Sequence, residues 1–284
     1  MSDLAVGLAS LHVYPVKSCA GIRVDEALVI ETGLEFDRAW MVVDQTGEFV
    51  SQRELPRMVL VQPRLRQHDM VLRAPGMLAL HIALDAVESP VRVRVWDDEV
   101  PAFDMGALAA QWFSDFLGRQ VRLARFDPDH QRLSDKRWTG AIDAENAFSD
   151  GYPLLVASTA SLAELNHRLA DGGHPVVGME RFRPNLVLDG LEAHGEDQLD
   201  EVRFETSDGP VVLKIVKPCA RCPIPDVDPA TGEPGQAVGT VLAAYRADAR
   251  VHGALTFGMD AVVMRGIDCA LRSGLRGEAT YAFG

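Results

Sequence analysis

The sequence predicts a mainly β protein with some α-helix, of the α+β class. Short segments of alternating apolar and polar residues fill the first hundred residues, a pattern typical of a barrel or sandwich. Helical periodicity is confined to a few short segments. The length of 284 residues suits one large or two ordinary domains, and a hydrophobic content of 47% provides a substantial core. We therefore predict a first domain over residues 1–122 and a second over residues 123–284.

The first domain is predicted to consist mostly of strands. Residues 4–14 are largely apolar and form the first candidate strand. An apolar run at 40–43, a turn at 44–47 and a returning apolar run predict a hairpin. Residues 91–96 alternate valine with arginine or tryptophan, which is the period of a half-buried strand.

A helix and a long polar segment follow these strands. Apolar residues recur with a helical period over 106–118, and Gly118 is placed to end the helix. Residues 125–151 are polar and rich in turn formers, without a clear period. We expect this segment to be a surface loop or lid between the domains.

The second domain mixes strands with short helices. A short buried strand is predicted at 153–158, followed by a helix at 160–173 that Ser158 or Thr159 can cap. Further strands are predicted at 181–190 and 211–218, a brief helix at 240–247 and a closing pair of strands at 254–266.

Composition and charge exclude several functional classes. A net charge of −13 argues against nucleic acid as a partner, because phosphate backbones would be repelled. Four cysteines in a chain of this length do not make a disulfide scaffold and favour a reducing compartment. The first residues lack a basic leader, and no apolar run is long enough to span a bilayer. We expect a cytoplasmic protein without a membrane partner.

The stretch from Lys217 to Pro229 carries the strongest chemical signal. Cys219 and Cys222 are three residues apart, beside Arg221, and nearby cations favour the thiolate form of a cysteine. Four prolines in the stretch exclude a regular helix and predict a stiff loop that presents sulfur. The residue types alone leave open a zinc half-site, a redox dithiol, a single thiolate ligand for a soft metal, or two ordinary cysteines.

Three other stretches place cations in turns or at strand ends. Lys17 and Ser18 lie in a turn that can cradle an anion, and Arg38 follows an aspartate just before an apolar strand. Arg183 and Asn185 occupy alternate positions, which would put them on one face of a strand. Each signal also suits an ordinary surface ion pair, but a large anionic ligand with a soft metal would use all of them.

Together these stretches resemble the MOSC superfamily, named for the C-terminal domain of molybdenum cofactor sulfurase. YPVKSCAGI, the Asp37-Arg38 pair and the Gln52 to Arg57 stretch are similar to its N-terminal β-barrel domain. RFRPN, KPCARC followed by VDPATG, and LTFGMD are similar to its MOSC domain, a β-barrel with a few helices. The resemblance covers nearly the whole chain and is closest to two-domain members such as the mitochondrial amidoxime-reducing component and its bacterial relatives.

The resemblance implies a molybdenum-pyranopterin cofactor held by one protein thiolate. It assigns Cys222 as metal ligand and catalytic residue. The residues that it implies for holding the cofactor are Lys17, Ser18, Arg38, Ser158, Thr159, Arg183, Asn185 and Arg221. Asp260 departs from the asparagine or tyrosine that family members commonly carry, and a carboxylate there is expected to repel an anionic cofactor.

The implied activity is the reduction of N-hydroxylated compounds such as amidoximes, hydroxylamines and N-hydroxylated bases. The electrons would come from a partner protein of the ferredoxin, flavin or cytochrome type, since no cysteines for an iron–sulfur domain are present. One alternative is a carrier that passes on the cofactor, or sulfur held as a Cys222 persulfide. Another is a cofactor-free binding module. Proton donor, substrate, oligomeric state and the role of Cys219 are left open.

Overall fold

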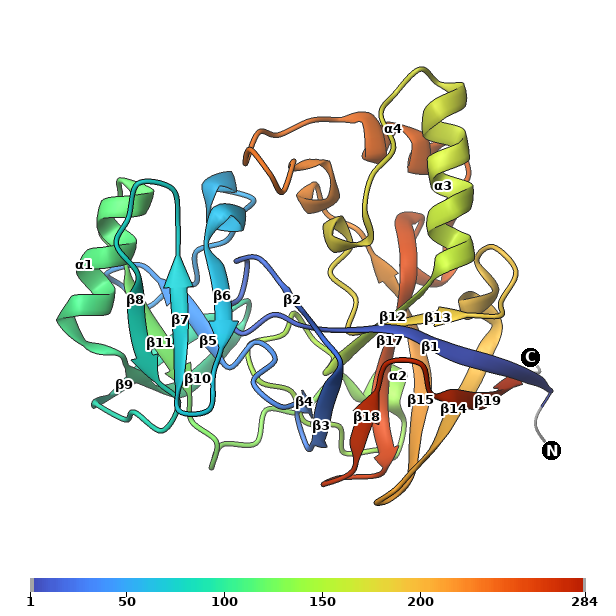
Figure 1. Ribbon diagram of the computed structural model, residues 1–284, viewed down its shortest axis with the longest axis horizontal. Helices are drawn as coiled ribbons and strands as arrows, with labels where there is room; N and C mark the ends of the chain where they lie inside the picture. The colour runs from blue at the N-terminus through green and yellow to red at the C-terminus, as the bar shows by residue number, and fades with distance from the viewer. Residues whose placement is uncertain (1–2, 283–284) are drawn as a thin grey trace.

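The computed structural model describes residues 3–282 and confirms a mainly β protein with few helices. Two β-rich units lie side by side, with the longer helix α3 on the outer side of the second unit (Figure 1). No helix among the described residues is long and apolar enough to cross a membrane.

The second unit is a closed barrel of seven strands. Following hydrogen-bonded neighbours, the ring runs β12, β13, β1, β19, β14, β15 and β17, and β17 pairs with β12 to close it. The strands are β1 Leu4–Val13, β12 Leu154–Ser158, β13 Leu186–Asp189, β14 Leu199–Thr206, β15 Gly209–Ala220, β17 Ala254–Arg265 and β19 Arg276–Tyr281. Neighbouring strands are antiparallel, except that β12 and β13 are parallel. Apolar side chains of alternating positions fill the barrel interior.

The first strand of the chain belongs to this barrel. β1 pairs with β13 on one side and β19 on the other, and β2 (Ile22–Val24) pairs with β1. β3 (Glu26–Ile30) pairs with β4 (Gly33–Leu34) and with β18 (Ala270–Arg272), and β16 (Ala247–Asp248) pairs with β17. The boundary between residues 122 and 123 remains a prediction, and the structure adds that residues 4–13 and 22–34 pack with the barrel, whereas Val16 and Cys19 pack with the first unit.

The first unit contains two smaller sheets and one helix. One sheet is ordered β5 (Trp40–Val43), β11 (Arg122–Phe126), β10 (Asp98–Asp104) and β9 (Ser89–Val95). The other is ordered β6 (Gln62–Leu65), β7 (Asp69–Arg73) and β8 (Leu80–Ala83). Helix α1 (Gly106–Leu117) packs its aromatic face into the core and ends at Gly118 in the left-handed region, as the sequence predicts.

The segment between the units lies largely at the surface, as expected, but its end is buried and anchored and so is not a free lid. It contains the short helix α2 (Lys136–Thr139). The buried guanidinium of Arg132 donates to Asn146 Oδ1 at 2.5 Å and to the carbonyl oxygens of Ala147 and Ser149 at 2.9 and 2.8 Å. It also donates to Asp98 Oδ2 of β10 at 2.7 Å. These bonds fix the end of the segment against the first unit.

Two further expectations for the second half have clear outcomes. Helix α3 (Thr159–Asp171) is capped by Ser158 as predicted, since its side chain accepts from Ser161 N at 3.1 Å. The closing strand pair is wrong, because β17 is one strand that bends at Gly258 (φ +77°). The remaining helices are α4 (Ala237–Ala243) and the 3-10 turns η1 (Pro56–Leu60), η2 (Met179–Arg181), η3 (Gly195–Gln198), η4 (Ile224–Asp226) and η5 (Ala249–Val251).

Candidate functional site

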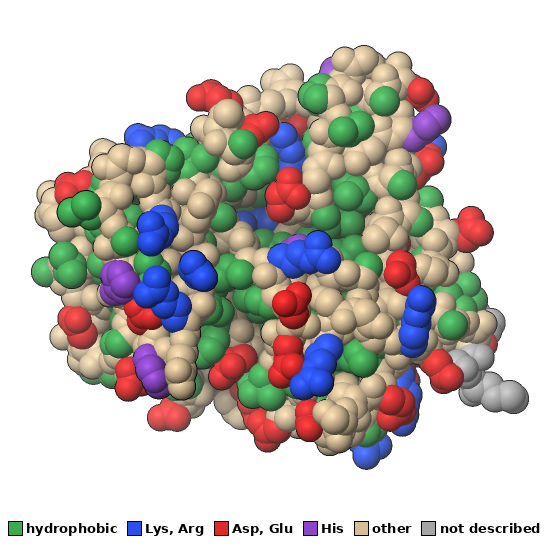
Figure 2. Space-filling model, viewed as in Figure 1, with side chains coloured by type: hydrophobic (Ala, Val, Ile, Leu, Met, Phe, Trp, Pro, Cys, Tyr) green, Lys and Arg blue, Asp and Glu red, His purple; other side chains and the backbone are tan. Residues whose placement is uncertain are grey.

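A cavity of about 230 Å³ lies where the two units meet, lined by residues from both. The space-filling view shows a hollow between the units with cationic side chains deep inside it (Figure 2). Six cations line the cavity, namely Lys17, Arg38, Arg53, Arg183, Lys217 and Arg221, against two carboxylates, Asp150 and Asp260. In a protein with a net charge of −13, this concentration of positive charge indicates an anion-binding site.

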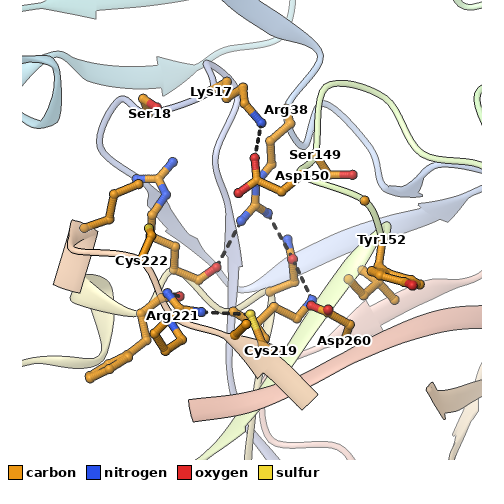
Figure 3. A pocket seen from close by; sticks show the side chains of 18 of the residues that line it. Lys17, Ser18, Arg38, Ser149, Asp150, Tyr152, Cys219, Arg221, Cys222 and Asp260 are labelled. Carbon is orange, nitrogen blue, oxygen red and sulfur yellow. Dashed lines mark hydrogen bonds and ion pairs between the residues drawn. The ribbon is translucent and has the colours of Figure 1, made fainter. Parts of the chain in front are cut away.

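The cysteine motif lies at the end of a barrel strand. β15 continues to Ala220, so Cys219 belongs to the strand and not to the stiff loop that we predicted. Arg221 N donates to Leu255 O at 2.7 Å, which extends the contact with β17 by one residue. Cys222 follows, half-buried, and the turn η4 begins two residues later. The strand end thus presents Cys222 to the cavity (Figure 3).

The two thiols of the motif are not equivalent. Burial, with help from nearby Asp260, raises the pKa of Cys219 to about 12, so its thiol is neutral at pH 7. The expected bias toward thiolate is therefore wrong for Cys219, because burial outweighs the adjacent cation. Burial opposes the charge of Arg221, but Cys219 and Cys222 raise the pKa of its guanidinium.

Arg221 links this motif to the preceding structure. It donates from Nη1 to Cys219 Sγ at 3.0 Å and from Nη2 to Phe182 O at 2.9 Å. All four cysteines are free, and among residues 3–282 no three histidine, cysteine or acidic side chains are grouped to hold a metal. A zinc site built from such a group has no support in the described chain.

One wall of the cavity is lined by Lys17, Arg53 and Asp150; together with Trp96, which contacts Arg53 and Asp150, we call it the loop wall. The buried ammonium of Lys17 donates to Asp150 Oδ1 at 2.5 Å and to Phe148 O at 2.7 Å. Arg53 reaches Asp150 Oδ2 at 3.4 Å and stacks over the Trp96 ring, whose Nε1 donates to Asp150 at 3.2 Å. The four residues come from four separate segments of the chain.

Arg38 and Arg183 form a stacked pair next to this wall. Their guanidinium groups lie 4.4 and 4.3 Å from the centroid of the buried Tyr14 ring. Arg38 forms an ion pair with Asp37 and donates to Asn185 Oδ1 at 3.0 Å. Burial and nearby Arg38 lower the pKa of Arg183 to about 10, which still leaves it cationic at pH 7.

The stretch around Arg183 is not a strand, which corrects our placement of Arg183 and Asn185 on alternate strand positions. η2 ends at Arg181, β13 begins at Leu186, and Arg183 adopts φ +59°. Ser18 and Arg38 share this left-handed conformation, with φ of +67° and +49°. Residues other than glycine rarely adopt it, and such strain gathers at ligand-binding sites.

The opposite wall, which we call the strand wall, consists of Tyr152, Lys217, Cys219 and Asp260. Lys217 of β15 and Asp260 of β17 are register partners, and Lys217 Nζ lies 3.2 Å from Asp260 Oδ2. Lys217 also lies 5.1 Å from the centroid of the Tyr152 ring. Figure 3 shows Cys219 and Asp260 on the side of the cavity away from Lys17 and Ser18.

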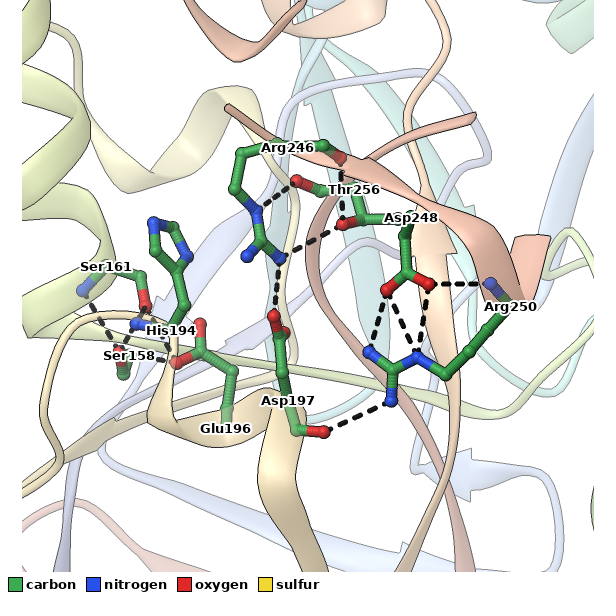
Figure 4. Close-up of polar contacts among 9 residues, drawn as sticks. All are labelled: Ser158, Ser161, His194, Glu196, Asp197, Arg246, Asp248, Arg250 and Thr256. Carbon is green, nitrogen blue, oxygen red and sulfur yellow. Dashed lines mark hydrogen bonds and ion pairs between the residues drawn. The ribbon is translucent and has the colours of Figure 1, made fainter. Parts of the chain in front are cut away.

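Ser158 and Thr159 are the two predicted site residues that the structure does not bring to the cavity. Ser158 is fully buried, and its hydroxyl donates to Glu196 Oε2 at 2.8 Å (Figure 4). Ser161 donates to the same oxygen at 2.7 Å. The start of α3 therefore faces a buried carboxyl of the protein itself. The other predicted residues, Lys17, Ser18, Arg38, Arg183, Asn185, Arg221 and Cys222, all line the cavity.

Sequence analysis missed the part of the cavity formed by residues 149–152. Asp150 and Tyr152 lie there, at the end of the polar segment that we had assigned to the surface. The available signal was their position directly before a buried strand, where polar turn residues often carry function. Arg53 lies in the Gln52 to Arg57 stretch that carries part of the resemblance, but it was not among the predicted site residues.

The cavity fits a large anionic ligand. Besides its six cations, the described lining contains two buried donor groups without a hydrogen-bond partner, Arg221 Nε and the Tyr152 hydroxyl. Buried polar atoms are rarely left unpaired in native proteins, so these two suit a ligand rich in acceptors. A half-buried thiol beside them suits a soft metal. The residues therefore fit a phosphorylated, sulfur-containing metal cofactor.

Comparison with known proteins finds both halves of the chain in one family. A model described as the MOSC N-terminal beta barrel domain matches residues 5–120, and one described as the MOSC domain matches residues 143–268. Mitochondrial amidoxime-reducing component 1 of Mus musculus is 37% identical over 234 residues, which are 79% of this chain and 66% of the relative. Mitochondrial amidoxime reducing component 2 of Rattus norvegicus is 36% identical over 79% of this chain and 68% of the relative.

A second kind of relative is longer. Molybdenum cofactor sulfurase of Homo sapiens is 31% identical over 257 residues, which are 84% of this chain but 28% of the sulfurase. The chain thus spans about two thirds of the amidoxime-reducing relatives and little more than a quarter of the sulfurase. Matches to two family models and to relatives above 30% identity agree with the barrel and its cavity: the chain belongs to the MOSC family.

Proposed function

We propose that the chain binds a molybdenum-pyranopterin cofactor in this cavity and reduces N-hydroxylated compounds. One observation carries the proposal: a single half-buried thiol, Cys222, ends a barrel strand in a cavity lined by six cations. The relatives, whose names refer to amidoxime reduction and the molybdenum cofactor, support the same conclusion.

Different residues of the cavity would hold different parts of the cofactor. Cys222 would be the metal ligand, and Arg221 beside it would balance the negative charge. Lys17 and the stacked pair Arg38 and Arg183 would hold the phosphate and pterin, with Asn185 orienting Arg38 through its 3.0 Å hydrogen bond. When bound, the cofactor supplies two-electron redox chemistry, while the protein sets position and electrostatics.

The partners follow from the chemistry. Reduction of an N–OH group consumes two electrons, and among residues 3–282 no cluster of cysteines could hold an iron–sulfur group. A separate donor protein of the ferredoxin, flavin or cytochrome type would supply the electrons. The substrate would be a small amidoxime, hydroxylamine or N-hydroxylated base.

The test is the metal and pterin content of protein expressed in a molybdenum-replete host. We expect one molybdenum and one pterin per chain, and loss of most of the molybdenum in Cys222→Ala. Cys219→Ala is the matched control, because its thiol is neutral and pairs with Arg221, so we expect it to retain the metal. The loaded wild type should reduce a simple amidoxime with a chemical electron donor, and failure to do so would contradict the proposed activity.

The relation to molybdenum cofactor sulfurase favours a carrier as second candidate. In that case Cys222 would hold a persulfide and pass its sulfur to a client. Metal-free protein with labile sulfur bound to Cys222, and no reductase activity after cofactor loading, would support the carrier over the reductase.

A further inference from the structure

A second cavity, which we call the apolar pocket, adjoins the first at the cysteine motif. Its volume is about 170 Å³, against about 230 Å³ for the cavity described above. Arg221 and Cys222 line both cavities. The two therefore meet at the residue that the proposed function assigns to the metal.

The two cavities differ in chemistry. The first is lined by six cations and two carboxylates, whereas the apolar pocket has one cation, Arg221, and one carboxylate, Asp226. Its other lining residues are mostly apolar, and the side chains that the argument uses are those of Val238, Leu242 and Leu255. Such a lining suits an uncharged apolar group and offers little to a phosphate.

One side of the apolar pocket is formed by the protein core. Val238 and Leu242 lie four residues apart on α4, hence on one face of the helix, and are exposed over only 2% and 1%. Both belong to a buried apolar cluster, and Leu255 of β17 packs against that cluster. These three side chains are therefore held in place by a helix, a strand and the core between them.

The other side is a loop that the structure anchors twice. Arg181 donates to the carbonyl oxygens of Pro225 and Val227 at 3.2 and 2.9 Å. The carboxylate of Asp226 accepts from Gly239 N, with its oxygens at 3.1 and 3.2 Å, and so joins the loop to the first turn of α4. The pocket is thus formed before any ligand binds.

The size of the pocket indicates what it can hold. Protein interiors leave few voids larger than a water molecule, so an apolar pocket of this size is not ordinary packing. An apolar cavity of about 150 Å³ engineered in another protein binds benzene. A pocket of about 170 Å³ has room for one aromatic ring or a branched aliphatic group of similar size.

We propose that the apolar pocket binds the apolar substituent of the substrate, with Val238, Leu242 and Leu255 determining specificity. The inference rests on the proposed function and defines its substrate class. The N–OH group would lie at Cys222, while an aromatic or branched aliphatic substituent enters the pocket. Hydroxylamine and other small substrates leave the pocket empty and gain no binding energy from it.

The first experiment compares benzamidoxime, which carries a phenyl ring, with acetamidoxime, which carries a methyl group. Cofactor-loaded protein is supplied with a chemical electron donor. We expect the wild type to favour benzamidoxime by about 10-fold or more in kcat/KM, mainly through KM, since the ring is bound alike before and during the reaction.

Two variants of α4 show whether the pocket causes this preference. Val238→Phe fills the pocket and should remove most of the preference by raising KM for benzamidoxime, with little change for acetamidoxime. Val241→Phe is the matched control, because it introduces the same side chain three residues further along α4, outside the pocket lining, and should keep the preference.

A second measurement needs no cofactor. Cofactor-free protein with labelled methyl groups is titrated with each amidoxime and followed by NMR. Benzamidoxime should shift the methyl signals of Leu242 and Leu255 in the wild type and in Val241→Phe, but not in Val238→Phe. Acetamidoxime should leave these signals in place.

The possible outcomes separate the inference from the proposed function. If Val238→Phe lowers kcat/KM equally for both substrates, or if benzamidoxime leaves the methyl signals unchanged, the inference is overturned while the proposed function stands. If loaded wild type reduces neither amidoxime, the proposed function falls and the inference with it, whatever the methyl signals show.

A further variant covers the case in which Val238→Phe does not fold. Leu242→Ala enlarges the pocket instead of filling it. It should raise kcat/KM for 2-naphthamidoxime relative to benzamidoxime by about 10-fold, and an unchanged ratio would overturn the inference.

Discussion

The two walls of the cavity contain the same kinds of residue but are built differently. The loop wall joins Lys17, Arg53, Trp96 and Asp150 from four segments, and its contacts are ion pairs and a stacked cation. The strand wall sets Lys217 opposite Asp260 through the register of β15 and β17. The geometry of a wall made of loops depends on the side-chain contacts that anchor each loop. A wall made of paired strands is held by backbone hydrogen bonds and keeps its geometry when one side chain changes.

The charged groups of the two walls differ as well. The loop wall provides ion-paired groups, of which Asp150 is the exposed member, and its cations suit recognition of an anion. The strand wall provides buried groups whose charge depends on their surroundings. Substitutions that remove an anchoring contact of the loop wall should therefore lower the free energy of unfolding. Substitutions of the strand-wall side chains should change how that free energy depends on pH.

Arg132→Met should have the largest effect on the free energy of unfolding, because it removes the hydrogen bonds that anchor the loop wall. The change leaves the buried carbonyls of Ala147 and Ser149 without their donor, and leaves Asn146 Oδ1 with only the Ser149 hydroxyl. Each unpaired buried group costs about 1–3 kcal/mol, so we expect the free energy of unfolding to fall by about 3 kcal/mol or more. Urea unfolding measures it. Arg92→Met, which removes an exposed pair with Glu99, is the control and should cost under about 0.5 kcal/mol.

Gly258→Ala should have the second largest effect on stability, because it strains the bend of β17 two residues before Asp260. At φ +77° a Cβ atom would lie 2.7 Å from Val156 O, so the strand must shift. We expect a loss of about 2 kcal/mol in unfolding free energy. Gly253→Ala is matched, with φ +79° but no heavy atom within 4 Å, and should cost about 1 kcal/mol. Equal losses in the two variants would mean that the strand wall tolerates movement.

The smallest expected effects are those of Asp150→Asn and Asp260→Asn, which should change the free energy of unfolding at pH 7 in opposite directions. The lowered pKa of Asp150 stabilises the fold above the usual carboxyl pKa of about 3.9, and this is lost as pH falls through the folded value. Asp150→Asn should therefore be less stable than wild type at pH 7, by about 0.5–1 kcal/mol given its exposure, and the difference should shrink steadily as pH falls below about 4.

The raised pKa of Asp260 has the opposite effect on stability at pH 7. The folded state binds the proton more tightly, so stability falls as pH rises above about 4. Asp260→Asn should be more stable than wild type at pH 7 and equal to it near pH 3. Cofactor-free protein, unfolded by urea across this range, gives both comparisons, and shifts of the same sign would remove the distinction between the walls.

Sequence reasoning captured most of the fold because its signals are local. The alternation in residues 91–96 appears as β9, the helical period over 106–118 as α1, and Ser158 as the cap of α3. The pairing of β1 with β19 could not be predicted, because nothing within residues 4–13 specifies a partner almost a whole chain away. The bend at Gly258 was also hidden, since a strand that bends at glycine resembles two strands in sequence.

The site was predictable where residue type and turn context coincide, and not elsewhere. Lys17, Arg38 and Cys222 stand out in the sequence, and the cavity includes them. Asp150 belongs to a polar segment whose anchor, Arg132, is recognisable only from its burial and its acceptors in the structure. Whether Cys219 carries a charge likewise depends on burial, which a neighbouring arginine in the sequence does not reveal.

The pairing of β1 with β19 also bears on how the protein is made. Leu4 lies opposite Ala279, so the ring of seven strands cannot close on the ribosome before residues 276–281 have emerged. Until then β1 and β14 each expose an unpaired edge, and contacts of such long sequence separation form slowly. The ring of seven strands is therefore completed only when residues 276–281 are available to pair with both β1 and β14.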